Sequence, residues 1–232
     1  MRFKILLVGA LLAIVGGSVW AQEWVHPLKT DHGPVTMHVT SGASYWSALF
    51  NPAAADTDAV HSVYATSASA ATTQTFTAAE SAVLDYPRNV TLTISGTAAN
   101  VNGGTTTLTG KNILGDTITE AYTLTENTVE TLTGAKAFKS VSSLLINIQD
   151  GTNVKVSVGI GSKFGMQTTN VTNGVVLADV DGIKETTAPT VAVSGAAIES
   201  NTISFNTAPN GTKDVSYVTL VSPYRVTTSD TR

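Results

Sequence analysis

The chain has 232 residues, of which 13% are charged, and its formal net charge is -4. This length fits one large β domain or two small ones, and the weakly acidic balance without a basic run argues against a nucleic-acid-binding protein. The absence of cysteine excludes disulfides, cysteine nucleophiles and zinc sites built on thiolates.

The first segment, residues 1–21, has the layout of a secretory signal peptide. Arg2 and Lys4 give it a basic start, and an apolar run follows. Val19 and Ala21 occupy the cleavage positions, so the mature chain would begin at Gln22. The run is short for a spanning helix, which needs about 20 residues. Two interpretations stay open: a cleaved signal, or a retained arm that packs on neighbouring subunits.

The next segment, residues 22–85, is predicted to be an N-terminal region of strands and loops. Apolar residues alternate over 35–39, which predicts a strand, and 60–64 and 73–76 are two further candidates. Between and around them the chain is rich in Ala, Thr and Ser.

The central segment, residues 86–168, carries the clearest strand pattern. Apolar residues alternate with polar ones, often threonine, over 89–95, 117–124, 144–148 and 154–160. A period of two predicts strands with one face on a core and one in water. Threonine suits the outer face, because its β-branch fits the pleat while its hydroxyl stays solvated.

Glycine-containing turns separate these strands and predict a meander. Asn102-Gly103-Gly104 and Gly115-Asp116 are turn signals, and Asp150-Gly151 predicts a hairpin between its two flanking strands. In the last segment, residues 169–232, we expect a strand at 175–177 and a hairpin that pairs 203–205 with 215–217.

Many short strands with turns between them predict an all-β protein, an antiparallel β-sandwich of immunoglobulin-like or jelly-roll-like type. Residues 86–168 would form its core, and 169–232 would complete it. A smaller β subdomain over 22–85 is an open alternative.

Two strings of residues have some metal-ligand character. Asp56, Asp58 and His61 are spaced D-x-D-x-x-H, a spacing that could ligate a metal, but a polar loop before a strand is the favoured interpretation. Asp179 and Asp181 resemble the opening of a calcium loop, although the third acidic position and the bidentate Glu are missing. A plain turn is the favoured interpretation, so no metal or cofactor is predicted.

Catalytic motifs are not recognisable either. Gly159, Gly161 and Gly165 nearly spell a dinucleotide fingerprint, but the spacing differs by one and no helix pattern follows. Close approach of two backbones explains these glycines better. The sequence has no G-x-S-x-G elbow, and nothing nominates a carboxylate pair. We therefore expect a protein that is not an enzyme.

Three asparagines, Asn89, Asn170 and Asn210, match the glycosylation sequon, as expected by chance in a threonine-rich chain. The aromatic residues of the N-terminal region are candidates for an interface or a glycan-stacking platform, because tryptophan and tyrosine are enriched at binding hot spots. Packing in a core is the alternative. The candidate interface residues are Trp24, Tyr45, Trp46 and Phe50.

Several stretches together resemble small β-rich virion proteins of tailed bacteriophages, of decoration, head-fibre or minor capsid type. The stretches are PRNVTLT (87–93), LTGKNILGDTITE (108–120), GAKAFKSV (134–141), VSVGIGSKFG (156–165), NTISF (201–205) and APNGTKD (208–214). The resemblance implies a role in assembly, with no catalytic or cofactor-binding residues. It implies other virion proteins, or copies of the chain itself in a homo-oligomer, as partners.

The leader departs from this pattern, because phage capsid proteins assemble in the cytoplasm without a secretory signal. We therefore expect a structural protein located in the virion, with a secreted cell-surface or adhesin-like module as the alternative. A membrane would be contacted only through a retained leader, and nucleic acid is not an expected partner.

Overall fold

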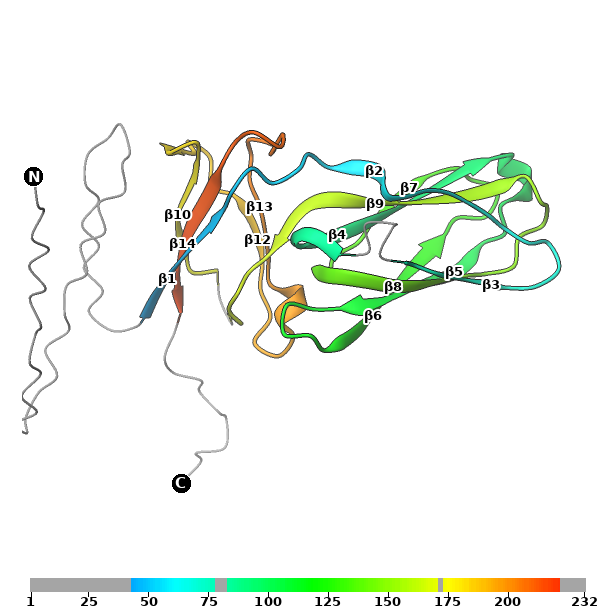
Figure 1. Cartoon of the computed structure of the whole chain (residues 1–232), viewed down its shortest axis with the longest axis horizontal. Helices are drawn as coiled ribbons and strands as arrows, with labels where there is room; N and C mark the ends of the chain where they lie inside the picture. The colour runs from blue at the N-terminus through cyan, green and yellow to red at the C-terminus, as the bar shows by residue number, and fades with distance from the viewer. Residues whose placement is uncertain (1–42, 78–82, 171–172, 222–232) are drawn as a thin grey trace, which may run out of the picture.

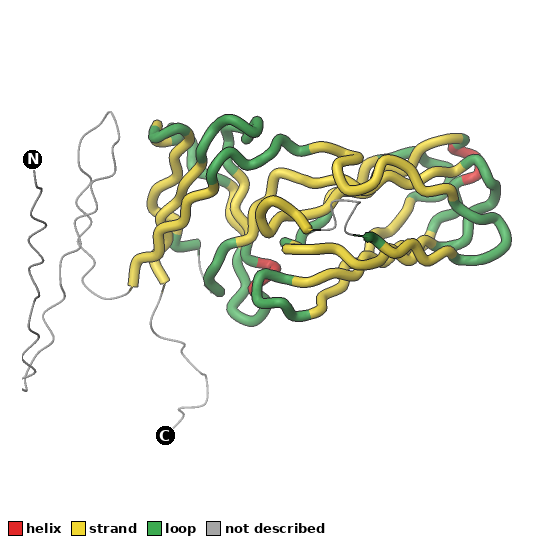
Figure 2. Tube along the Cα trace, in the orientation of Figure 1, coloured by secondary structure: helices red, strands yellow, loops and turns green. Residues whose placement is uncertain are grey.

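The computed structural model describes residues 43–77, 83–170 and 173–221. In this part of the chain almost all regular structure is antiparallel strand, which confirms the predicted all-β fold. The helical elements among the described residues are two single turns, η2 (Ala98–Asn100) and η3 (Ile198–Ser200). Figure 2 shows how strand and loop alternate along the trace.

A ten-stranded sheet curls into two layers of a sandwich. The pairings give one layer in the order β7 (Thr131–Thr133), β4 (Val83–Gly96), β9 (Val154–Gly165) and β2 (Asp56–Ala65). They give the other in the order β6 (Thr117–Leu124), β5 (Gly104–Lys111), β8 (Phe138–Ile146) and β3 (Thr72–Thr75). Both layers are visible in the right half of Figure 1.

Strand β4 connects the two layers. Its first part lies beside β8, where Val83 is opposite Ser140 and Arg88 is opposite Phe138. From Arg88 onward it pairs with β9, and the register shifts on both sides of this residue. Pro87 precedes the crossing, and proline is tolerated there because the ladder is already interrupted.

The alternation predicted from sequence builds the core between the layers. Val90, Leu92 and Ile94 of β4 face inward, as do Leu108 of β5 and Leu144 of β8. Burial of each such side chain stabilises the fold by roughly 1.5–3 kcal/mol. Thr91 departs from the expected outer, solvated position and is 7% exposed; it lies on β4, which is flanked by β7 and β9 on its two edges.

A second sheet of four strands packs at one end of the sandwich (Figure 1). Its order is β1 (Ala43–Leu49), β14 (Val215–Val221), β10 (Val175–Val180) and β11 (Ile183–Lys184). Two short strands continue the larger sheet beside the end of β9: β13 (Thr202–Ser204) pairs with Phe164 and Gly165, and β12 (Thr190–Ala192) pairs with β13. A second apolar cluster joins the parts and includes Leu49, Phe164, Ile203 and Tyr217.

The predicted meander is wrong. The turn at Gly115-Asp116 does join two paired strands, β5 and β6. However, the strands on either side of Asp150-Gly151 are separated by β4 in the sheet, so they form no hairpin. Asp150 instead donates its N–H to the Asn100 carbonyl at 3.0 Å, a contact between residues far apart in sequence that ties this connection to η2.

The predicted hairpin of 203–205 with 215–217 is also wrong. β13 pairs with β9 and β12, whereas β14 pairs with β1 and β10. Of the expected N-terminal strands, 60–64 lies in β2 and 73–76 overlaps β3, and both strands belong to the sandwich layers. The strand expected at 35–39 lies outside the described residues.

Candidate interaction surface

The outer face of the β6–β5–β8–β3 layer carries a continuous set of threonines, which we call the threonine face. On these strands the apolar residues point into the core and the intervening residues are exposed or half-buried. No member of the set is charged, but the exposed Lys111 of β5, which lies opposite Thr117, borders it. Its members are Thr73, Thr75, Thr105, Thr107, Thr109, Thr117, Thr119, Ala121, Thr123, Ser143 and Leu145.

The strand register aligns these side chains in rows across the layer. Thr109 lies opposite Thr119 on one side and Ser143 on the other, and Ser143 lies opposite Thr75. Neighbouring strands are about 4.8 Å apart, and residues i and i+2 are about 6.7 Å apart along a strand. The surface therefore presents hydroxyl and methyl groups at short, regular intervals.

An apolar residue lies within this array. Leu145 of β8 is 45% exposed, and it stands opposite Thr107 on one side and Thr73 on the other. Exposed leucine beside threonine methyl groups adds apolar contact area to a surface that can also donate and accept hydrogen bonds. Such a mixture is suited to contact with another protein.

Next to the threonine face, Glu120 of β6 is engaged by backbone and side-chain donors. Its Oε1 accepts the N–H groups of Ala135 and Lys136 at 2.6 and 3.1 Å, and its Oε2 lies 3.1 Å from the Tyr122 hydroxyl. That hydroxyl also lies 3.0 Å from the Val90 carbonyl. Burial, together with the negative charge of Glu120, raises the pKa of Tyr122. These groups hold a loop against the layer.

Sequence reasoning missed the most buried charge in the described part of the molecule, Arg88. Its side chain is 0% exposed, and its Nε donates to the Gly161 carbonyl at 2.8 Å. Its other nitrogens donate to Asp85 and to the Ala53 carbonyl, and its guanidinium carbon lies 4.6 Å from the centre of the Phe164 ring. Burial lowers the pKa of Arg88, and Asp85 opposes this shift. The signal available in the sequence was a lone arginine just before an apolar alternation.

The structure does not bring Asp56, Asp58 and His61 together as a metal site. Asp56 Oδ1 accepts the N–H of Asp58 at 3.1 Å, which lowers the pKa of Asp56, while the hydrogen bond to Asp56 raises the pKa of Asp58. The His61 ring instead stacks on Tyr64 at 3.6 Å and bonds to the Val63 carbonyl. Within residues 43–77, 83–170 and 173–221, no three His, Asp or Glu side chains are placed to hold a metal ion.

The other acidic string forms a turn, as favoured from sequence. Asp181 and Gly182 have φ angles of 54° and 74°, which is the type I′ geometry that joins β10 to β11. Asp181 accepts the backbone N–H of Asp214 at 3.0 Å, and buried Asp179 accepts the hydroxyl of Ser216.

Of the three glycines of β9, Gly159 marks the expected close approach of two backbones, whereas Gly161 and Gly165 lie close to side chains. A Cβ on Gly159 would lie 2.1 Å from the Asp56 carbonyl oxygen, and one on Gly161 would lie 2.2 Å from the Asn89 side chain. Asn89 and Asn170 are buried, which is incompatible with glycosylation of either sequon in the folded chain; Asn210 is exposed.

The candidate aromatic residues are placed only in part. Trp24 lies outside the described residues, whereas Tyr45 and Trp46 lie in β1, opposite Thr219 and Val218 of β14. Phe50 follows directly and is 64% exposed, with its backbone N–H and carbonyl both bonded to the Tyr86 hydroxyl. The structure thus places three of the four residues in or next to one strand.

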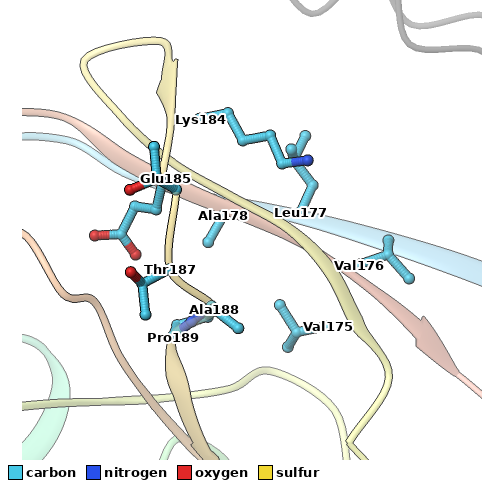
Figure 3. A pocket seen from close by; sticks show the side chains of 10 residues that line it. Val175, Val176, Leu177, Ala178, Lys184, Glu185, Thr187, Ala188 and Pro189 are labelled. Carbon is cyan, nitrogen blue, oxygen red and sulfur yellow. The ribbon is translucent and has the colours of Figure 1, made fainter.

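A cavity of about 250 Å³ lies beside β10 and β11. Val175, Ala178 and Pro189 contribute apolar walls, and Glu185 contributes a carboxylate whose Oε1 accepts the Thr207 N–H at 2.6 Å. Figure 3 shows Lys184 extending away from that carboxylate. The volume is below the roughly 300–1,000 Å³ usual for ligand pockets, so we take the threonine face as the candidate site.

None of the described helices is long and apolar enough to cross a membrane. No protein-family model, no curated protein and no solved structure matches the chain.

Proposed function

We propose that the chain is a non-enzymatic structural protein that decorates or stabilises the surface of a bacteriophage particle. The observation that supports this function most is the threonine face, a regular array of mostly hydroxyl-bearing side chains over four strands, with the charged Lys111 at its border. The resemblance of the central segment to phage virion proteins points the same way.

The chemistry of this face suits a permanent contact between proteins. A charged surface would have to lose its hydration on binding, which costs several kcal/mol per ion unless each charge finds a partner. Threonine hydroxyls need only a neutral partner, and their methyl groups bury apolar area. Because the side chains stand on a sheet and are β-branched, little side-chain freedom is lost when they are covered.

The engagement of the titratable groups supports a structural role as well. Glu120 and Arg88 each make several hydrogen bonds to backbone groups of other segments. These charged groups therefore hold loops and strands in place.

Co-sedimentation with purified particles of the phage that encodes the chain tests the proposal. The wild-type protein should sediment with particles at a fixed stoichiometry. Thr107→Lys and Leu145→Lys, each at the centre of the threonine face, should weaken binding roughly tenfold or more, because each places a charge in the contact. Thr152→Lys, at an exposed position in the loop before β9, is the matched control and should bind normally. Equal binding by all variants, or none by the wild type, would contradict the proposal.

A secreted cell-surface module is the second candidate, because residues 1–21 have the layout of a signal peptide. The mass of the native protein separates the two functions. A chain that begins at Gln22 in the culture medium or on the cell surface would favour the secreted module.

A further inference from the structure

The free edges of the sheets differ in how they are protected against pairing with another strand. An edge strand exposes unpaired backbone groups, and proteins usually blunt such edges with short strands, charged side chains or irregular register. Four edge strands of this chain, β3, β7, β11 and β12, contain only four, three, two and three residues.

The two longer edges of the sandwich carry further protection. β2 contains Asp56 and Asp58, and its register against β9 shifts twice along its length. β6 is covered by the loop after β7: Lys136 donates its ammonium to the Thr119 carbonyl at 2.9 Å, and Glu120 binds the backbone of Ala135. Another strand cannot reach this part of β6 without displacing these bonds.

β1 has none of these features. Its seven residues, ASYWSAL, contain no charge and no proline, and their register with β14 is continuous from Ala43 to Leu49. Among the described residues, β1 pairs with β14 alone. Apolar side chains are exposed at its borders: Phe50 is 64% exposed, and Leu220, opposite Ser44 on β14, is 37% exposed.

We propose that β1 pairs with β1 of a second copy of the chain, antiparallel about a two-fold axis. The two four-stranded sheets would then join into one continuous sheet. A second copy is the fitting partner because a strand paired with its own copy sets each side chain opposite one from the same strand, and β1 has no charge that would then face a like charge. Self-pairing closes at two copies because the same edge is used by both. This inference rests on the proposed function, in which many copies gather on one particle.

Cysteine cross-linking tests this arrangement, since the chain has no cysteine of its own. Single cysteines are placed in turn at each position from 43 to 49, and the protein is oxidised gently. When two copies of one strand pair antiparallel, the numbers of any two residues that face each other add up to the same value along the whole contact. Only one position then faces its own counterpart, so cross-linking between two copies of the same cysteine variant should peak there. If all seven residues overlap, this position is Trp46. Mixed variants two residues to either side of the peak should cross-link to each other and not to themselves.

Light scattering provides the second readout. Ser44→Lys should raise the dissociation constant of the dimer roughly tenfold or more, because each copy then places a charge in an otherwise uncharged contact. Thr57→Lys, on the protected edge of β2 and outside the threonine face, is the matched control and should leave the dimer unchanged, and Thr57→Cys should not cross-link.

A monomer without cross-links along 43–49, or cross-links with no positional peak, would overturn the inference. An intramolecular disulfide between a cysteine in β1 and a second cysteine placed in 1–42 would also overturn it, since the edge would then be covered by the chain itself. If β1 fails to cross-link while the protein still binds particles, the proposed function stands alone. If the dimer forms but no particle binding is found, the proposed function fails and the pairing of β1 remains.

Discussion

The buried guanidinium of Arg88 donates to both carboxylate oxygens of Asp85, at 3.2 and 3.0 Å. Asp85 in turn accepts the backbone N–H of Ala53, and Arg88 donates to the carbonyl of the same residue. This pair fixes the connection between β1 and β2 to the point where β4 crosses between the layers. The four-stranded sheet and the sandwich are thereby held together by polar bonds as well as by the apolar cluster around Phe164.

Asp85→Ala should lower the free energy of unfolding by on the order of 3 kcal/mol, because it leaves Arg88 buried without its counter-charge. Asp150→Ala, an exposed acidic residue in a loop, is the control and should change stability by less than about 0.5 kcal/mol. Urea unfolding followed by circular dichroism measures both. Equal midpoints would show that the pair does not stabilise the fold.

Tyr122 predicts a loss of stability at alkaline pH. Its pKa is raised in the folded chain by burial and by Glu120, so the folded state keeps a proton that the unfolded state loses above its ordinary pKa of about 10. The stabilisation of the fold by protonated Tyr122 is therefore fully present below about pH 10. Above this pH the free energy of unfolding decreases by about 1.4 kcal/mol per pH unit.

The comparison of wild type with Tyr122→Phe isolates this effect. The variant should be less stable at neutral pH, because it loses the hydroxyl contacts with Val90 and Glu120, but its stability should fall less steeply above about pH 10. Tyr86→Phe, which removes a half-buried hydroxyl, provides a control for general loss of a tyrosine. Parallel stability–pH curves for wild type and Tyr122→Phe would be inconsistent with the raised pKa.

Gly159→Ala should separate β2 from β9. The added methyl would meet backbone atoms of Asp56 and Thr57 at 2.1 to 2.5 Å, so the strand must move, at a cost of roughly 1–3 kcal/mol. Gly103→Ala is the matched control, because its nearest neighbours lie at 3.3 to 3.5 Å. Thermal unfolding should show a clear decrease in midpoint for the first variant only, and the opposite order would refute the close approach.

Asn201→Asp should be strongly destabilising. The buried Asn201 side chain donates to the carbonyls of Ser194 and Ala197, each at 2.8 Å, and accepts the N–H groups of Asn170 and Ser194. An aspartate cannot donate when ionised, so two carbonyls would face a buried negative charge, with a loss on the order of 3 kcal/mol.

Asn206→Asp offers the matched comparison for this prediction. Asn206 also donates to two carbonyls, those of Thr187 and Ala188, but it is exposed, so water can replace the lost bonds. Its midpoint in urea should shift much less than that of Asn201→Asp, and equal shifts would argue against burial as the cause.

Much of the fold could be predicted from alternation, because a period of two reports which face of a strand is buried. Val90, Leu92 and Ile94 are inside, and the threonines of β5 and β6 are mainly outside, as expected. Alternation does not report which strands are neighbours. The insertion of β4 between β8 and β9 depends on bonds far apart in sequence, such as those of Arg88, and local turn signals could not indicate them.

The candidate surface, like the fold, could be predicted from the sequence only in part. The pattern indicated outward threonines, but their alignment in rows depends on the register of β5 with β6 and β8. The aromatic residues pointed to the region of β1 without indicating that β1 is an edge strand among the described residues. Edge position is a property of the whole sheet, because it depends on β14 lying between β1 and β10.

Quantitative mass spectrometry of purified phage particles tests the central proposal most directly, with the intact mass and copy number of the chain as its readout. The proposed function predicts that the chain is present in a fixed ratio to the major capsid protein. Absence from the particles, together with a chain starting at Gln22 in the secreted or cell-surface fraction, would contradict it.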